Sequence, residues 1–401
     1  MRHLILLLPL LGGCAKSVIP LYEAARDEAL RDPGPPPANW VADAWVQISS
    51  PSLDDLLLAL LEENALLTET FDAGIVQVTP RLNLSDLAIM PSNGCADCLT
   101  VDLGLTGTVA WKGALGTGST ALSGTGQFDA VFDVVQDAGD WTVSTKPRKL
   151  RNIGVSLAGN KLGIPIGPIT DWITSSLLEN VPALVLTTFP AEDLPLRAVR
   201  VVPVQKAVRV EVLTRAPDPV AAPAPPPRVP QGWAVGISTG SLLAAARAEA
   251  FRKGPITYDV VAEPTALDIT PDSFTLGLRL WRIAGKGWWR DYTVLGKVAL
   301  GPDGVELTAE RVVEGPKSDG AVVADPLAAL GEGRILDGLE KAIAITLPAD
   351  ETAKVGGVRT SVRLQELIRE GDGGLRANGS LDVLDAPPGE PGKRPRPKVR
   401  P

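Results

Sequence analysis

The sequence predicts an α+β protein made of two tandem modules, each a long, curved antiparallel sheet packed on amphipathic helices. A short phrase recurs, as ISSPSL at 48–53 and ISTGSL at 237–242, with a tryptophan a few residues upstream each time (Trp45 and Trp233). The helix and strand patterns that follow come in the same order both times. A proline-rich stretch at 216–230 separates the two blocks. Self-similarity of this kind indicates a tandem duplication.

The recurring phrase opens a predicted helix in each block. Ser50 and Pro51 suit the N-cap and the first helical position, and Asp54 and Asp55 suit the positive first turn. An apolar stripe at helical spacing follows, formed by Leu53, Leu56, Leu57, Leu60 and Leu61. The second block begins in the same way, with the run Ser238-Thr239-Gly240-Ser241 followed by Leu242, Ala245, Ala246 and Ala250.

Strict alternation of apolar and polar residues predicts long, half-buried antiparallel strands after each first helix. In the first block the alternating apolar residues are Leu99, Val101, Leu103, Leu105, Val109 and Trp111, and then Phe128, Ala130, Phe132 and Val134. The DAGD sequence at 137–140 predicts a turn between two strands. In the second block the alternation runs through 274–280 and 292–300, with turns at AGKG and GPDG.

A second helix is predicted late in each block. In the first it runs through Ile169, Trp172, Ile173, Leu177 and Val181, and in the second through Leu330, Ile335, Leu336, Leu339 and Ile343. The segments that follow also correspond, FPAEDLPLRAVR at 189–200 against LPADETAKVGGVR at 347–359. The matched beginnings and ends support the duplication.

The chain therefore divides into six predicted parts. They are a lipoprotein signal peptide (1–13), a lipidated N-terminus and tether with a short helix near 22–30 (14–44), a first module (45–215), a proline-rich linker (216–230), a second module (231–385) and a disordered, basic, proline-rich tail (386–401). Seven of the fifteen linker residues are proline, so we expect a semi-rigid polyproline II spacer rather than part of a core.

Composition narrows the class of function. The 401 residues are 45% hydrophobic and 21% charged, which is typical of a folded protein. The net charge of −8 argues against a nucleic-acid partner, because such a partner needs a basic footprint. The single histidine, His3, lies in the predicted signal peptide.

The N-terminal sequence MRHLILLLPLLGGC has a positive residue, a short apolar core and a cysteine, and it resembles the bacterial lipobox. We expect Cys14 to be lipidated and to anchor the chain in a membrane. Ala15 follows the cysteine in place of the aspartate that marks inner-membrane retention, which favours export to the outer membrane and leaves its periplasmic or surface face open. The alternatives are an ordinary signal peptide and a fortuitous apolar start.

The remaining cysteines, Cys95 and Cys98, form a CADC turn. Export to an oxidising compartment favours a disulfide between them. Free thiols are one alternative. Metal or redox chemistry is the other, but a zinc site needs about four ligands and the mature chain offers no histidine and no second cysteine pair. We expect no bound metal and no cofactor.

Because the predicted mature chain has no histidine, Ser-His-Asp and Cys-His nucleophiles are excluded from it. Paired carboxylates occur at 54–55, 62–63 and 192–193, but adjacent helical positions point in different directions, which favours caps and solvated faces. We therefore expect a protein that is not an enzyme.

The doubled order of helix, long antiparallel strands, helix and final strands resembles the tubular lipid-binding (TULIP) superfamily. This is the group with bactericidal/permeability-increasing protein and the synaptotagmin-like lipid-transfer modules, and the chain looks closest to bacterial lipoproteins that carry two such modules. The phrase LPLRAVRVVPV at 194–204 contributes to the likeness, which covers most of 45–385. The resemblance implies lipid binding through shape and an apolar lining, and it transfers no individual residue.

On this basis we expect an envelope lipoprotein that binds or carries a lipid or hydrophobic ligand in apolar clefts. The expected lining consists of Val101, Leu103, Leu105, Phe132, Leu276, Leu278 and Leu280. The alternative is a structural or protein-interaction lipoprotein whose clefts are filled by its own side chains, because a packed core and a lipid-lined groove use the same residues.

Two further features bear on partners. In LWRIAGKGWWRDY a turn on Gly285 would place Trp281 and Trp289 opposite each other, on the face away from Leu278, Leu280 and Tyr292. The pair suits a membrane interface, or packs against the other block or a covering helix. The five basic residues from Lys393 to Arg400 give either a solvated end or attraction to an anionic envelope polymer.

Overall fold

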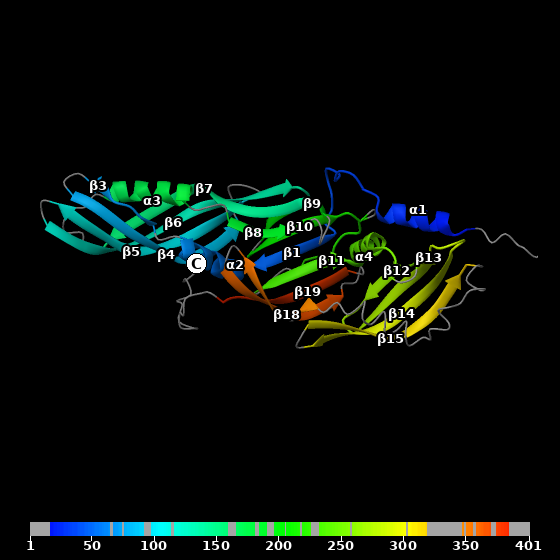
Figure 1. The fold of residues 1–401 in the computed structure, drawn as a ribbon. Coiled ribbons are helices and arrows are strands. Elements are labelled where there is room, and N and C mark those ends of the chain that lie inside the picture. The colour runs from blue at the N-terminus through cyan, green and yellow to red at the C-terminus, as the bar shows by residue number, and fades with distance from the viewer. Residues whose placement is uncertain are drawn as a thin grey trace, which may run out of the picture.

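The computed structural model describes the chain at 17–64, 67–73, 76–91, 98–113, 116–158, 166–180, 184–190, 196–204, 206–216, 219–225, 232–256, 259–301, 304–318, 347–348, 350–355, 358–369 and 374–384. This part of the chain is mostly antiparallel sheet with four helices, as the α+β prediction requires. The molecule is elongated, with a sheet at each end and a third sheet between them (Figure 1).

The middle sheet, here the central sheet, draws strands from both halves of the sequence. Its order is β17 (Asp350–Val355), β18 (Val358–Arg369), β19 (Gly374–Val383), β11 (Trp233–Ser238), β1 (Ala44–Ser49), β10 (Ala207–Thr214) and β9 (Leu196–Val204). The two halves meet where β1 pairs with β11.

The β1–β11 pair has the register of a two-fold axis. Ala44 pairs with Ile237 and Ile48 pairs with Trp233, while Val46 and Val235 are opposite each other at the centre. Aligning the two recurring phrases places position 48 on 237, an offset of 189 residues, and the same offset carries Val46 onto Val235. The strands β1 and β11, which correspond at this offset, therefore pair so that Val46 lies opposite its counterpart, Val235.

The first-half sheet lies at one end of the molecule, with α3 against it (Figure 1). Its order is β2 (Leu67–Thr68), β4 (Val76–Pro91), β5 (Cys98–Gly113), β6 (Gly116–Asp137), β7 (Asp140–Leu157) and β8 (Leu184–Phe189), with β3 (Phe71–Ala73) also paired to β4. Helix α2 (Ser50–Asn64) contacts β4 and α3 (Ile166–Asn180) contacts β7.

The second-half sheet lies at the other end. Its order is β12 (Val260–Ile269), β13 (Ser273–Arg282), β14 (Trp288–Gly301), β15 (Gly304–Lys317) and β16 (Leu347–Pro348), and α4 (Thr239–Lys253) contacts β12. Each half thus supplies, in the same order, a central strand, a helix, four long strands and strands that return to the central sheet. The predicted helix through Leu330 and Ile343 lies outside the described residues.

Serine pairs begin α2 and α4. The Ser241 backbone N–H donates to Ser238 Oγ at 3.1 Å, and the Ser52 backbone N–H donates to Ser49 Oγ at 3.4 Å. The prediction placed the first cap on Ser50, which is one residue too late, because Ser49 is the side chain that reaches the helix. Ser49 is thus the counterpart of Ser238 at the 189-residue offset.

Irregular pairing bends the first-half sheet. The register shifts between Leu84 and Asp86 and again between Thr125 and Gln127, and such bulges increase the local bend and twist of a strand. The concave inner face packs against α2 and α3 through an apolar cluster that includes Leu53, Leu105 and Ile173. Curvature therefore comes from bulges set within otherwise strictly alternating strands.

The segment before β1 contains α1 (Ile19–Ala29), which begins three residues before the short helix predicted near 22–30, and the segment is not a free tether. Tyr22 is buried against Phe251 and Trp281, and the Arg197 guanidinium donates to the carbonyl of Gly34 at 3.0 Å. Figure 1 shows α1 beside the second-half sheet, near β13.

The proline-rich linker is also docked where it is described, at 219–225. Trp45 Nε1 donates to the Pro223 carbonyl at 2.7 Å, and the Ala222 backbone N–H donates to Ala42 at 2.9 Å. Ala216, at the start of the linker, is 4% exposed. The expectation of a spacer outside the core is therefore wrong at Ala216 and Pro223, which are buried, because Pro223 packs beside Trp45.

Candidate functional site

The predicted apolar lining of the first half lies on the inner face of its sheet. Val101, Leu103 and Leu105 alternate along β5 and are at most 4% exposed. They belong to one cluster with side chains of α2 and α3. Phe132, on β6, is partly buried against the same cluster. The structure therefore brings the four predicted residues to one face.

Beyond these residues the inner face stays partly exposed along two strands. The partly buried apolar side chains on β6 and β7 are Phe128, Phe132, Val134, Leu150, Ile153 and Val155. Gly126 lies on the same face of β6 and is itself buried, and a Cβ there would lie 3.2 Å from Leu103 Cδ1. A row of large apolar side chains that its own helices do not fully cover is a surface suited to an apolar ligand.

The corresponding face of the second half is filled by its own side chains. Leu278 and Leu280 are 5% and 7% exposed, and Leu276 is partly buried against the same cluster. Trp288 and Tyr292, each 5% exposed, complete the packing. The predicted lining residues of the second half thus share a face, and the described part of that face is a packed core.

The tryptophan pair is where the pattern placed it, but Trp281 does not face solvent. Trp281 pairs with Trp289 across β13 and β14, and Gly285 in the turn has a φ of +65°. Trp281 is 2% exposed because Tyr22 of α1 packs edge-on against it, with ring centroids 6.0 Å apart. The membrane-interface prediction is therefore corrected for Trp281, which a covering helix buries. Trp289 is partly buried beside it.

A buried carboxylate holds this outer face together. Glu263, on β12, is 2% exposed and accepts hydrogen bonds from Trp281 Nε1 and Arg247 Nε, both at 2.6 Å. Arg279 binds both carboxylate oxygens of Asp291, and its guanidinium lies 4.4 Å from the ring centroid of Trp289. The bonds to Asp291 raise the pKa of Arg279 above its ordinary value, so its charge is permanent.

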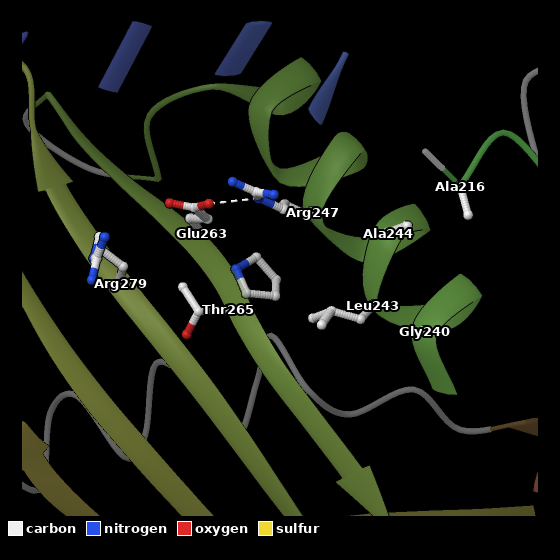
Figure 2. Close-up of a pocket in the computed structure, with 9 residues that line it drawn as sticks. Ala216, Gly240, Leu243, Ala244, Arg247, Glu263, Thr265 and Arg279 are labelled. Atoms are coloured by element: carbon white, nitrogen blue, oxygen red, sulfur yellow. Dashed lines mark hydrogen bonds and ion pairs between the residues drawn. The ribbon is translucent and has the colours of Figure 1, made fainter. Parts of the chain in front are cut away.

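Figure 2 shows a pocket of about 350 Å³ between α4 and the strands β12 and β13. Arg247 comes from α4 on one side, and Glu263 and Arg279 come from the sheet. The apolar end is lined by Ala216, Gly240, Leu243, Ala244 and Pro264. Each guanidinium already faces a carboxylate, so the charged end of the pocket carries no net attraction for an ion. Sequence reasoning missed this pocket, since its residues come from four separate segments.

Among the described residues, Asp54 is a carboxylate whose surroundings strongly raise its pKa. It lies near the start of α2, and its Oδ1 accepts the Ile89 backbone N–H at 3.0 Å. Burial raises the pKa of Asp54 to about 7, with smaller contributions in the same direction from Asp55 and Asp86, while the Ile89 hydrogen bond opposes the rise. Asp54 is therefore a partly buried carboxylate at the contact between α2 and β4.

Cys98 is in a disulfide bond and its side chain is fully buried. Its predicted partner, Cys95, lies outside the described residues. So do the predicted lipidation site, Cys14, and the basic tail at 386–401.

No described helix is long and apolar enough to cross a membrane. No group of three or more histidine, cysteine, aspartate or glutamate side chains is placed to hold a metal ion among the described residues.

Comparison with known proteins finds no matching family model and no matching curated protein. Among solved structures, the chain is similar to one titled "Crystal structure of lipopolysaccharide binding protein", with 12% identity and a TM-score of 0.40 over 86% of this chain and all of that one. It is also similar to P47 of Clostridium botulinum E1 (9% identity, TM-score 0.40, 85% and 99% covered) and P47 of Clostridium botulinum A2 (10%, 0.41, 84% and 97%). At these identities and TM-scores, the ligands of those proteins are not assigned to this chain.

Proposed function

We propose that this chain is a non-enzymatic envelope lipoprotein that is anchored by Cys14 in the bacterial outer membrane and binds a lipid or other hydrophobic ligand. Its two halves would be TULIP-like modules produced by tandem duplication. The basic tail would add attraction to an anionic envelope polymer. The proposal rests on the lipobox-like start, the repeated element order and, above all, one apolar surface.

The observation that carries the proposal is the partly exposed inner face of the first-half sheet. Phe128, Phe132 and Ile153 lie on it beyond the fully buried residues of β5. Covering such a face with an acyl chain would gain about 25 cal/mol for each Å² of apolar surface removed from water. Several hundred Å² would therefore give several kcal/mol, before the cost of ordering the ligand is subtracted.

The second half favours a different candidate. The described part of its inner face is packed by Leu278, Trp288 and Tyr292, all at most 5% exposed. A chain with both halves closed in this way would be a structural or protein-interaction lipoprotein with no ligand. The two candidates differ in whether the first-half face is occupied by a foreign molecule.

Native mass spectrometry separates them. The soluble chain from Ala15 to Pro401, purified without detergent from several expression hosts, should carry a co-purifying lipid. A clean unliganded mass from every host would remove the ligand proposal and leave the structural candidate.

A matched pair of variants locates the ligand. Phe132→Glu places a charge on the inner face, and Val135→Glu places one on the outer side of the same strand, where Val135 is 48% exposed. Phe132→Glu should lose the co-purifying lipid and Val135→Glu should retain it. Equal retention by both folded variants would show that the lipid binds elsewhere.

Lipidation has its own test. The full chain should incorporate labelled fatty acid and float with vesicles, and Cys14→Ser should lose both properties. Incorporation that persists in Cys14→Ser would refute the anchor at this position.

A further inference from the structure

We propose that the bilayer holding the lipidated Cys14 lies against the β13–β14 turn of the second-half sheet, with the far end of the first-half sheet directed away from it. The proposal rests on the proposed lipidation, and it names the surface that the anchored protein turns toward its membrane.

The chain is fixed to this turn only a few residues after the anchor. The Val18 backbone N–H donates to the Lys286 carbonyl at 3.0 Å, and Ser17 Oγ donates to the same carbonyl at 3.2 Å. Gly287 makes the close approach possible, since a Cβ there would lie 2.8 Å from Val18 Cγ2. The docking is therefore specific to this turn.

Helix α1 holds the contact in place. Tyr22 is 8% exposed and packs against Phe251 and Trp281, and Glu28 pairs with Arg247 at 3.3 Å. A helix fixed at both its ends does not act as a loose tether. The position of Ser17 on the second-half sheet is thus set by the fold.

Covalent geometry then limits the distance to the membrane. Ser17 is three residues after Cys14, and an extended chain spans at most about 3.6 Å per residue, so the two Cα atoms are within about 11 Å of each other. Because its acyl chains are inserted in the bilayer, the lipidated Cys14 must lie at the bilayer surface. The β13–β14 turn is therefore within about the same distance of the lipid headgroups.

The side chains at this end fit a membrane surface. Lys286 in the turn and Lys317 at the end of β15 are exposed, and both can meet anionic headgroups. Leu21, in the first turn of α1, and Ile256, whose backbone N–H donates to the Val260 carbonyl at the start of β12, are 57% and 66% exposed. Basic and apolar side chains together suit the interface.

The opposite end of the molecule is defined by the first-half sheet. Trp141, at the start of β7, donates from Nε1 to the Leu196 carbonyl in the central sheet at 3.4 Å. The Asp137–Asp140 end of β6 and β7 therefore faces the centre, and the opposite end of β5 and β6, where Lys112 pairs with Thr117, is directed away from it.

Fluorescence quenching by lipid tests the orientation. A dye would be attached in the lipidated full-length protein to Lys286→Cys or to Lys112→Cys, and vesicles of phosphatidylethanolamine and phosphatidylglycerol would carry a nitroxide on the headgroup. The dye at 286 should be quenched several-fold more strongly than the dye at 112. Equal quenching, or stronger quenching at 112, would overturn the proposal.

The result does not depend on whether lipidation itself is correct. If the full chain fails to float, the proposed anchor has failed, and a maleimide lipid coupled to Cys14 then supplies an anchor at the same atom. Stronger quenching at 286 than at 112 would then still support the docking geometry. Any other result would reject it.

A matched pair on α1 separates docking from simple proximity. Tyr22→Ala removes the buried ring, and Glu23→Ala changes an exposed neighbour on the same helix. Tyr22→Ala should free the segment and reduce the difference between the 286 and 112 positions, while Glu23→Ala should leave it unchanged. A difference that survives Tyr22→Ala would show that α1 does not set the orientation.

Discussion

Val46 and Val235 face each other across the β1–β11 pair, and each lies two residues before the recurring phrase, 189 residues apart. The register between the two strands is therefore symmetric about this pair. The pairing also makes the central sheet continuous between the halves, so each half completes its sheet only with the other present.

Gly236 should be the position in this joint that is least tolerant of a side chain. A Cβ there would lie 2.4 Å from Trp45 Cε2, and Trp45 is 2% exposed and bonded to Pro223, so it cannot move aside. We expect Gly236→Ala to lower the free energy of unfolding by about 2–3 kcal/mol in urea titrations. Gly167→Ala, at a glycine with no atom within 4 Å of an added Cβ, is the control and should be neutral or stabilising. Equal stability of the two variants would contradict a tightly packed joint.

The local structure was largely predictable from the sequence. Alternation along β5 follows from a sheet with one buried face, and it identified Val101 and Leu105 as inner-face residues. The cap of α2 was placed one residue late, because Ser49 and Ser50 are adjacent and either suits an N-cap by residue type. Only the position of Ser49 beside the Ser52 backbone N–H decides between them.

What the sequence could not supply were contacts between distant segments. Trp281 and Trp289 were correctly paired across the hairpin, but the residue that buries Trp281, Tyr22, is far away in the chain. The contact between Glu263 and Arg247 could not be predicted for the same reason, because no recognisable sequence pattern links the two residues. Chain periodicity reports which face of a strand is apolar, and it does not report what covers that face.

Trp281 should therefore act as a core residue. Trp281→Ala would remove the ring that packs against Tyr22 and leave Glu263 without one of its donors, at an expected cost of about 3–5 kcal/mol in the free energy of unfolding. Trp289→Ala, which removes a partly buried ring beneath Arg279, should cost about 1 kcal/mol. Urea unfolding measures both. If Trp281→Ala kept its stability and lost vesicle binding instead, Trp281 would belong to a membrane interface.

The Cys98 disulfide should protect the native protein from alkylation. Cys98 is bonded and fully buried, so the exported chain should react with iodoacetamide only after reduction. Peptide mapping should assign the bond to Cys95 and Cys98. The closed loop is short, so Cys95→Ser with Cys98→Ser should cost little stability. Labelling before reduction, or a crosslink from Cys98 to another cysteine, would disprove this pairing.

Asp54 should make stability depend on pH. Its pKa is raised from 3.8 to about 7 in the folded chain, so between about pH 4 and pH 7 the native state holds a proton that the unfolded chain has released. Stability should therefore fall as pH rises through this window and stay level above it. Allowing for the partial exposure of the side chain, the total change should be about 2 kcal/mol.

Asp54→Asn isolates this effect, because the amide oxygen can still accept the Ile89 backbone N–H while the charge is removed. The variant should be more stable than the parent at pH 8, about equally stable at pH 4, and should lack the decline between them. Asp171→Asn, at an exposed carboxylate on α3, should retain the decline of the parent. Urea titrations at several pH values measure all three proteins. A decline that persists unchanged in Asp54→Asn would assign it to another group and would show that the carboxylate at the α2–β4 contact is charged in the folded chain at pH 5–6.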